Sequence, residues 1–551
     1  MIIPEQGAQL PAAAKAKEFL AIASQFKLGD LITEMPHPKT EHLSYLAKSD
    51  LPKAIRLLQE VDCDALRVVI GKTPEILQLA TCIQNTLKSG HRVFFVGCGA
   101  TGRLSLSLET LWRESLDPKH PWADRVRSFM AGGDVALIRS IENFEDHPSY
   151  GAKMLVQSGF EQGDLLIAST EGGETPYVIG AALHAPSISI QNHWFLFCNP
   201  PEVLIPKLER SKEALLCPNL QKMNLTVGPM ALSGSTRMQA STVLMLAAGT
   251  ALFEALQPQV SFDSIEEKLE SILNHYGSSH LDFLSNFVQH ESAIYKKKNN
   301  VIYQTNDYGI TVVTDTTERS PTFSFDVFEN RLDTHLSPSL SYICIPGATT
   351  CNEAWNKILH RPARPLEGWA DYKNVAGPNR INGYDFSTSV VEWRTNSYPE
   401  VLQHIFDISR GAETIDFSFE QLKHKVSVRG LSLLNEHIFL KMLLNIHSTL
   451  VMGRLDRYQG NVMTCVRPSN FKLIDRSIRY VQYLLQQDRI VLSYEDICLQ
   501  CFVELETAKP NEPVVLKAYE ALKSKKLEQL NISSAGNAPR MPPKMMSSIN
   551  Q

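Results

Sequence analysis

Residues 92–115 read RVFFVGCGATGRLSLSLETLWRES, and this stretch decides the fold. It opens with a largely apolar run of strand length, which is typical of a parallel strand buried on both faces. A glycine-rich turn follows at residues 97–102, and an apolar pattern of helical period begins directly after it. Strand, glycine turn and helix in this order predict one unit of an α/β domain with a parallel sheet.

The same order recurs along the chain and predicts two similar α/β halves between helical ends. In the first half, further strands are expected at RVRSFM (125–130), LLIAST (165–170) and WFLFC (194–198), and a long amphipathic helix at 235–256. In the second half, strands are expected at VIYQT (301–305), GITVVT (309–314), SYICI (341–345) and FSTSVVEW (386–393). Thr350 and Glu353 have the spacing of a helix capping box, and a long buried helix is expected at 432–453.

Composition excludes several classes of protein. The 551 residues carry 54 Lys and Arg against 59 Asp and Glu, without the positive surplus that nucleic-acid binding needs. The longest nearly apolar stretch, residues 243–256, is too short to span a bilayer, and the N-terminus lacks the pattern of a signal peptide. Ten scattered cysteines indicate reduced thiols. We therefore expect a cytoplasmic protein that binds neither nucleic acid nor membrane.

The glycine turn matches G-x-G-x-x-G, which makes a dinucleotide site the first interpretation to weigh. Such a site needs an acidic residue about 20 positions later to bind the ribose. The nearest candidate, Asp134, follows Gly102 by 32 positions and comes after two glycines rather than at a strand end. A hydroxyl at Thr101 and a cation at Arg103 suit a phosphate monoester better. A tight turn without any ligand is the remaining interpretation.

Two more hydroxyl-rich loops support a phosphorylated ligand. They are STEGGET (169–175) and LSGSTR (232–237), and each lies at a predicted strand end or helix start. One such loop is usually only a turn or a helix cap. Because parallel sheets gather ligands at the carboxyl ends of their strands, three of them in one domain predict a small phosphorylated ligand.

Five motifs together resemble the family of the bacterial N-acetylmuramic acid 6-phosphate etherases and the glucokinase regulatory protein. They are GCGATGRL (97–104), AGGDVALIRSIENFED (131–146), TPYVIGAAL (175–183), GPMALSGSTRM (228–238) and SNFKLIDRSIRYV (469–481). The resemblance implies an α/β fold of two tandem SIS-like domains, doubly wound parallel sheets that bind phosphosugars, packed as an internal pseudo-dimer in a monomer. The implied boundaries are a helical segment at 1–48, SIS domains at 49–285 and 286–495, a helical lid at 496–530 and a disordered tail at 531–551.

The resemblance also implies the site. Its ligand would be a hexose or amino-sugar 6-phosphate, with no metal and no cofactor, and a sugar kinase is the implied protein partner of a regulatory form. Lys472 and Arg476 match cations that reach the sugar phosphate, and Glu145 matches an acid near the sugar. The implied phosphate-binding residues are Gly99, Thr101, Gly102, Ser169, Thr175, Ser235 and Thr236.

Whether the chain is an enzyme depends on a second carboxylate. Elimination of lactate needs a base and an acid, and the family supplies two glutamates. One matches Glu145, but the other matches Leu111, which cannot transfer a proton. Glu109 is two positions away, about 200° around the helix, and becomes the matching acid only if the alignment shifts by one turn. Glu174 stands where the etherases have an arginine. Glu171 and Glu174 are expected to be exposed loop acids, and the alternative is that one of them replaces the missing acid. The main interpretation is therefore a regulatory sugar-phosphate-binding protein; the alternative is an etherase-like lyase or a phosphosugar isomerase. A nicotinamide-dependent oxidoreductase is a third class.

Other polar residues have simpler interpretations. Cys498 and Cys501 form a single CxxC on a helical pattern, which is weak evidence for zinc or redox chemistry. His437 and His447 lie in an apolar helix and are expected to be interior, with His437 held in reserve for ring opening in an isomerase. Residues 315–320, DTTERS, are expected to form a polar turn.

Overall fold

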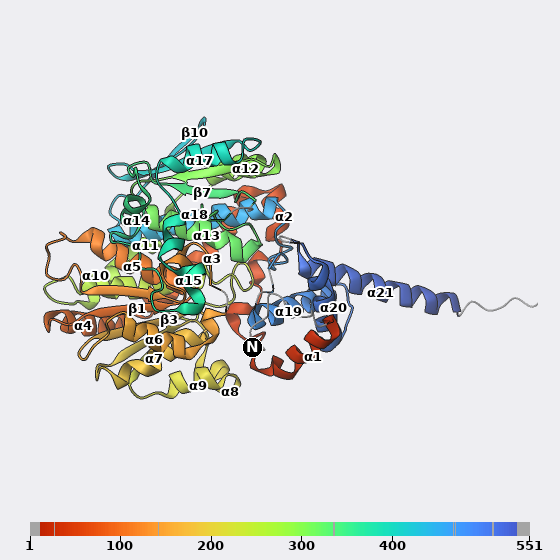
Figure 1. The fold of residues 1–551 in the computed structure, drawn as a ribbon, viewed down its shortest axis with the longest axis horizontal. Coiled ribbons are helices and arrows are strands. Elements are labelled where there is room, and N and C mark those ends of the chain that lie inside the picture. Colours follow the sequence, from red (N-terminus) through yellow and green to blue (C-terminus); the bar gives the residue numbers. More distant parts are fainter. Residues whose placement is uncertain are drawn as a thin grey trace, which may run out of the picture.

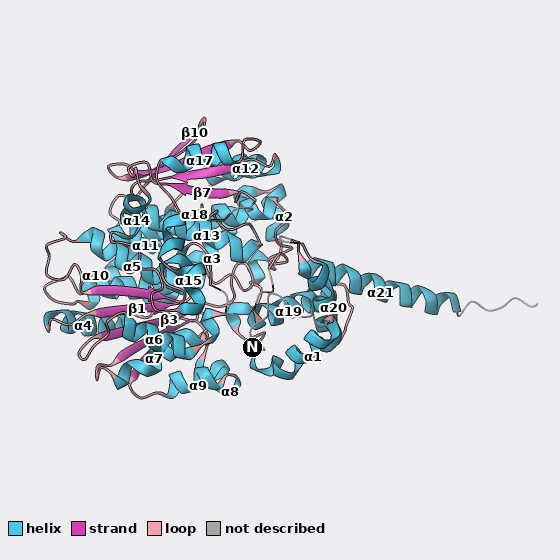
Figure 2. Ribbon diagram, in the orientation of Figure 1, coloured by secondary structure: helices cyan, strands magenta, loops and turns pink. Residues whose placement is uncertain are grey.

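The structure is a computed structural model that describes residues 11–26, 28–141, 143–333, 337–466, 468, 470–509 and 512–536. Two β-sheets lie on opposite sides of a layer of helices (Figure 1), and the strands form two separate groups when coloured by type (Figure 2). A helical cluster lies beside the first sheet, and its last helix extends away from the body. This confirms the α/β class with two sheets and helical additions.

The first sheet has five parallel strands in the order β2-β1-β3-β4-β5. The strands expected in this half are confirmed, whereas β5 was not predicted because LQKMN lacks an apolar run. The strands are β1 (Val93–Gly97), β2 (Val126–Met130), β3 (Leu165–Thr170), β4 (His193–Phe197) and β5 (Leu220–Asn224). The helices of this unit are α4 (Thr73–Lys88), α5 (Ala100–Ser115), α6 (Pro148–Gln157), α7 (Pro176–His184), α8 (Pro201–Lys207), α9 (Glu209–Leu216) and α10 (Gln239–Glu254).

The second sheet has the order β10-β9-β8-β6-β7 and is only partly parallel. Strands β7, β6 and β8 are parallel, while β9 and β10 are added as antiparallel hairpins. In the first unit β3 leads into a hydroxyl-rich loop and α7, but β8 turns directly into β9. The second unit therefore has no counterpart of the STEGGET loop at that strand end. Its strands are β6 (Asn300–Gln304), β7 (Ser341–Cys344), β8 (Gln403–Arg410), β9 (Thr414–Phe419) and β10 (Leu422–Ser427).

Four local predictions were wrong. GITVVT and the polar run 315–320 belong to one helix, α13 (Gly309–Phe323), and most of FSTSVVEW lies in α17 (Ser389–Ser397). Short apolar runs do not distinguish a buried helix from a strand, and packing overrides local propensity. Helix α10 is buried on almost every side rather than amphipathic. The capping box of Thr350 and Glu353 is confirmed at the start of α14 (Cys351–Leu359).

Helices from both halves meet between the sheets. Helix α18 (Leu433–Arg454) confirms the long buried helix and packs on α10 and α13. Buried polar side chains join the units here: Arg237 of the first half contacts Asp315 of the second at 3.0 Å. The remaining helices include α11 (Phe262–Ser278), which packs on α4 and α10, and α12 (Leu284–Lys296), which packs on α18 and β6. The short helices α15 (Lys373–Ala376) and α16 (Pro378–Gly383) pack on each other.

The two ends of the chain form the helical cluster beside the first sheet. Helix α1 (Ala12–Ile22) packs on α20 (Tyr494–Thr507), and α19 (Phe471–Gln487) packs on α20 and α21 (Val514–Gly536). Helix α19 lies within the range expected for the second domain but belongs to this cluster. Helices α2 (Leu43–Ser49) and α3 (Leu51–Ile70) lead into the first unit. Residues 531–536 continue α21, and the rest of the expected tail is outside the described residues. Among the described helices, none is long and apolar enough to cross a bilayer.

Candidate functional site

The glycine turn after β1 is built by its own backbone and one hydroxyl. Gly99 has φ +54°, a conformation that favours glycine, and α5 begins at the next residue. Thr101 Oγ1 accepts from the Cys98 N–H at 2.9 Å and donates to the Cys98 carbonyl at 2.9 Å. A side chain at Gly102 would approach Met130 Cβ to 2.7 Å, so the helix packs closely on β2. Thr101 therefore shapes the turn that presents the start of α5.

Two buried hydroxyls of the neighbouring loops have no partner. The Oγ atoms of Ser169, at the end of β3, and of Ser235, before α10, make no hydrogen bond with any described residue. Leaving a buried hydroxyl unpaired costs free energy, so these two positions are the best candidates for ligand contacts. The Thr175 hydroxyl instead pairs with Thr170 at 2.9 Å, and Thr236 is half-buried.

Glu145 connects the glycine turn to Asn470, the residue directly before helix α19. Cys98 Sγ donates to Glu145 Oε2 at 3.3 Å, and Asn470 Nδ2 donates to Glu145 Oε1 at 3.2 Å. Burial, with the Glu145 charge adding to it, raises the pKa of the Cys98 thiol well above its ordinary value. The thiol stays protonated and Glu145 remains the acceptor. The structure thus brings Glu145 to the glycine turn, as expected from the motif.

Lys472 and Arg476 reach the same loops but are already paired. Lys472 Nζ is 2.8 Å from Glu174 Oε1, and Arg476 holds Glu34 through Nε (2.9 Å) and Nη2 (2.7 Å). A side chain at Gly234 would lie 3.0 Å from Arg476 Nε, so α19 lies directly against the LSGSTR loop. The sequence did not identify Glu34 as a partner of Arg476, because a single glutamate in a segment expected to be helical forms no recognisable motif.

The two glutamates of the STEGGET loop have opposite charge states. Burial raises the pKa of Glu174, but Lys472 and Arg210 outweigh it and lower the pKa to about 2. For Glu171, burial dominates over its own backbone hydrogen bond and the charge of Lys472, and raises the pKa to about 8. Glu171 Oε1 is buried and has no hydrogen-bond partner in the described part of the chain. The cationic partners therefore favour the ionised form of Glu174, whereas burial favours the protonated form of Glu171.

The structure does not bring Glu109 to this group, because two positions along α5 turn it away. Its Oε2 accepts from the Ser128 N–H (3.1 Å) and hydroxyl (2.6 Å), and Arg364 Nη2 lies 2.9 Å from its Oε1. Despite burial, Arg361 and Arg364 lower its pKa to about 2. Glu109 thus bonds the outer edge of β2. Leu111, the residue that matches the second etherase glutamate, is buried in the core.

The remaining candidates are structural. Asp134 is paired with Arg361 at 2.6 Å, which leaves it unsuited to a ribose. His437 Nδ1 and the Thr311 hydroxyl form a hydrogen bond of 2.8 Å. Burial, together with the charge of Arg410, lowers the pKa of His437 to about 3. His447 contacts Glu291 at 2.6 Å. Cys498 and Cys501 are buried in α20, and no group of three or more metal-ligating side chains occurs among the described residues.

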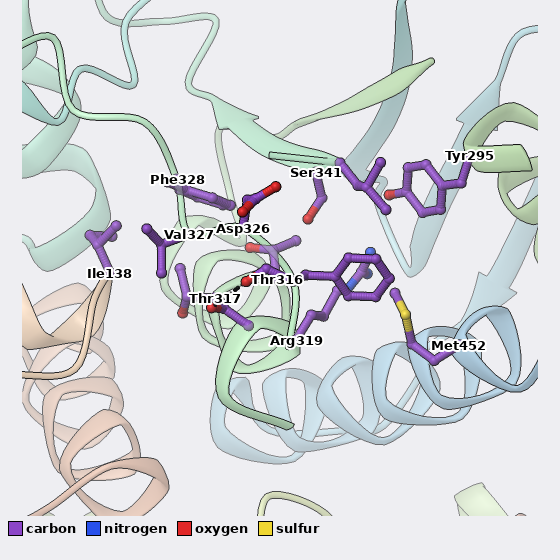
Figure 3. A pocket seen from close by; sticks show the side chains of 13 residues that line it. Ile138, Tyr295, Thr316, Thr317, Arg319, Asp326, Val327, Phe328, Ser341 and Met452 are labelled. Atoms are coloured by element: carbon purple, nitrogen blue, oxygen red, sulfur yellow. Dashed lines mark hydrogen bonds between the residues drawn. The ribbon is translucent and has the colours of Figure 1, made fainter. Parts of the chain in front are cut away.

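A small cavity lies away from these loops, beside α13 and the start of β7 (Figure 3). Thr317, Arg319, Asp326 and Ser341 are among the side chains that line it. Its volume is about 10 Å³, which is room for a single water molecule. It is too small for a sugar phosphate.

Comparison with known proteins points to one family. Residues 76–185 match the model of the glucokinase regulatory protein N-terminal SIS domain. The chain is 34% identical over 221 residues to an N-acetylmuramic acid 6-phosphate etherase of Prochlorococcus marinus (strain MIT 9303), covering 40% of this chain and 64% of that protein. The same enzyme of Rippkaea orientalis (strain PCC 8801 / RF-1) is 32% identical over 219 residues, covering 40% and 66%. The chain thus matches slightly less than two thirds of the length of these relatives.

Among solved structures, tagatose-6-phosphate ketose/aldose isomerase from Escherichia coli is similar over 78% of this chain and 97% of its own. The sequence identity is 11% and the TM-score 0.40. This likeness is too distant to bear on the site.

Proposed function

Because the chain carries a SIS domain of the glucokinase regulatory protein and N-acetylmuramic acid 6-phosphate etherase family, we propose that its first α/β unit binds a sugar phosphate. The ligand is a hexose or amino-sugar 6-phosphate. Its phosphate lies at the glycine turn of residues 99–102, and its sugar lies towards Glu145. The observation that carries the proposal is a pair of buried, unpartnered hydroxyls. Ser169 lies at the end of β3, which pairs with β1, and Ser235 lies in the loop against which Arg476 packs.

A thermal-shift panel of sugar phosphates, with the parent sugars as controls, tests this binding. Ligand at 100 times its Kd stabilises the protein by about 2.7 kcal/mol. Ser169→Ala and Ser235→Ala should each weaken binding by about tenfold, because each removes one hydrogen bond to an anion. Ser285→Ala is the matched control, since Ser285 in α12 is also buried and unpartnered within the described structure. No shift with any sugar phosphate, or equal affinity in all variants, contradicts the proposal.

The second candidate function is a lyase, favoured by the etherase relatives and by the protonated Glu171. Glu145 accepts the proton from the carbon next to the carbonyl, and the bond between the adjacent carbon and the lactyl oxygen breaks as a carbon–carbon double bond forms. Glu171 donates the proton that the departing oxygen takes up. N-acetylmuramic acid 6-phosphate is the substrate to test, with release of D-lactate as the measurement. Glu145→Gln should abolish release, and Glu171→Gln should lower it by a factor of about 100 or more.

The two candidates are separated by the same assay. Lactate release that depends on Glu145 establishes the lyase. Binding without release leaves the regulatory role, in which the occupied site changes the affinity for a sugar kinase; such a role requires that the ligand bind one arrangement of the protein better than another.

A further inference from the structure

A large cavity lies where the second half of the chain crosses the open edge of the first sheet. It is bounded by β2, by the end of α6 and by the loop of residues 363–369. Its volume is about 540 Å³, within the range of about 300–1,000 Å³ that small-molecule sites occupy. None of the residues proposed above to hold the sugar phosphate lines it.

The walls of this cavity are held by paired charges. Arg361 contacts Asp134 at 2.6 Å, and the Arg364 backbone N–H donates to the same carboxylate at 2.6 Å. Arg364 Nη1 also donates to the Ser128 carbonyl at 3.2 Å, and Glu109 accepts from the Ser128 N–H. These contacts occupy the backbone N–H and carbonyl of Ser128 at the edge of β2, so no further strand can pair with this residue. The side chains that bound the cavity are thus held in place in the absence of a ligand.

One charge in the cavity is left without a partner. The Arg127 side chain makes no hydrogen bond or ion pair with any of the residues that the structure describes. Burial and the charges of Arg92 and Arg364 lower its pKa. The two carboxylates whose charges act on Arg127 in the opposite direction are engaged elsewhere: Glu109 with Arg361 and Arg364, and Asp124 with Arg113 at 2.6 Å. The charged residues that line the cavity are Arg127, Asp134, Arg364 and Glu367. Asp134 and Arg364 are paired and Glu367 is exposed, so Arg127 is the half-buried charge that can receive an anionic group.

The opposite wall is apolar and ordered. Met154, Leu366 and Trp369 line it and are buried in the structure. Trp369 Nε1 donates to Gln157 Oε1 at 2.7 Å, and Lys153 Nζ lies 3.8 Å from the centre of the Trp369 ring. The indole is thus fixed in place before any ligand arrives, which lowers the entropic cost of binding.

We propose that this cavity binds a small organic anion, with its carboxylate or phosphate group on Arg127 and an apolar body against Met154, Leu366 and Trp369. A charge-assisted hydrogen bond to a half-buried guanidinium orients the anionic group, and the apolar wall selects against fully hydrophilic ions. The site is independent of the sugar-phosphate site of the first unit.

The test uses the full-length protein labelled with ¹³C at its methionine methyl groups. Benzoate and phenyl phosphate are the probes, since they share a ring and differ in the anionic group, and benzyl alcohol is the uncharged control. Either anion should shift the Met154 methyl resonance in a saturable way, while Met245 in the buried helix α10 should not move. Arg127→Gln should weaken the binding by about tenfold or more. Arg125→Gln is the matched control, because Arg125 bonds the Gly90 carbonyl and does not line the cavity.

A second variant keeps the test decisive. Ser158→Trp places an indole at the cavity rim and should also abolish the Met154 shift, with thermal unfolding confirming that each variant is folded. The proposal is overturned if neither anion binds, if benzyl alcohol binds as well as the anions, or if Arg127→Gln binds like the parent. The thermal shift by sugar phosphates should persist in Arg127→Gln, so the failure of one site is distinguishable from the failure of the other.

Discussion

Glu171 and Glu174 show how far neighbours decide the chemistry of a residue. They are three positions apart in one loop, yet one pKa is raised to about 8 and the other lowered to about 2. The difference is that Glu174 has two cationic partners, Lys472 and Arg210, at 2.8 and 2.6 Å, whereas burial dominates at Glu171. Near neutral pH, burial therefore favours the protonated form of Glu171, while the two cations favour the ionised form of Glu174.

The raised pKa of Glu171 predicts how its contribution to stability depends on pH. The folded state prefers the protonated acid, so this contribution is fully present below about pH 4.5, the ordinary value, and is lost as pH rises through about 8. Glu171→Gln, which cannot ionise, should lose less stability than the parent between pH 5 and pH 9. Thermal unfolding across this range measures it. Parallel curves for the two proteins would contradict the assigned charge state.

Glu174→Gln tests the opposite case. The variant removes the ion-pair partner of the half-buried Lys472 and Arg210, and we expect a loss of about 2–3 kcal/mol in the free energy of unfolding at pH 7. The Glu174 contribution is present above about pH 4.5 and is lost as pH falls through about 2, so the difference from the parent should shrink in acid. Urea unfolding measures it. Asp282→Asn is the control, because its pair with Arg56 is exposed and worth little.

At the scale of elements, the β1–α5 unit depends on glycines where the backbone turns back on itself. A side chain at Gly97 would lie 2.2 Å from the Thr101 carbonyl carbon, a backbone atom that cannot move aside. This close approach lets the first turn of α5 face the end of β1. The same closeness explains why the motif needs glycine there rather than any small residue.

Gly97→Ala should therefore lower the free energy of unfolding by about 3 kcal/mol or more and remove sugar-phosphate binding. Gly71→Ala is the matched control: Gly71 has φ −63°, and an added side chain there would meet its nearest atom only at 3.4 Å. Denaturant unfolding of both variants measures the difference. A Gly97→Ala protein as stable as Gly71→Ala would mean that the turn has another conformation.

At the scale of the whole molecule, the two ends of the chain meet on the first α/β unit. Glu34 holds Arg476 and Arg479, the Ser233 hydroxyl donates to the Glu34 carbonyl at 2.6 Å, and the Leu28 N–H donates to Asp475 at 3.3 Å. The first unit thus carries both terminal segments beside its candidate site, whereas the second sheet ends in hairpins.

Glu34→Gln should loosen both ends together. Arg476 and Arg479 then lose their ion pair with residue 34. Amide hydrogen exchange should therefore become faster in residues 28–34 and in α19. Exchange in β6 and β8 should not change, because those strands are in the other sheet. Unchanged exchange in α19 would show that apolar packing alone holds this helix.

The sequence by itself determined the α/β class, most first-half strands, the glycine turn and the motif that brings Glu145 to it. These are local features: a strand-length apolar run, a positive φ at Gly99 and a helical period depend on neighbours along the chain. It did not distinguish α13 from a strand, since GITVVT suits a buried strand as well as a buried helix. Only the tertiary structure paired Lys472 with Glu174, 298 positions apart, protonated Glu171 and left Arg127 unpaired in a cavity. Charge pairing and burial depend on distances in space, which no stretch of sequence contains.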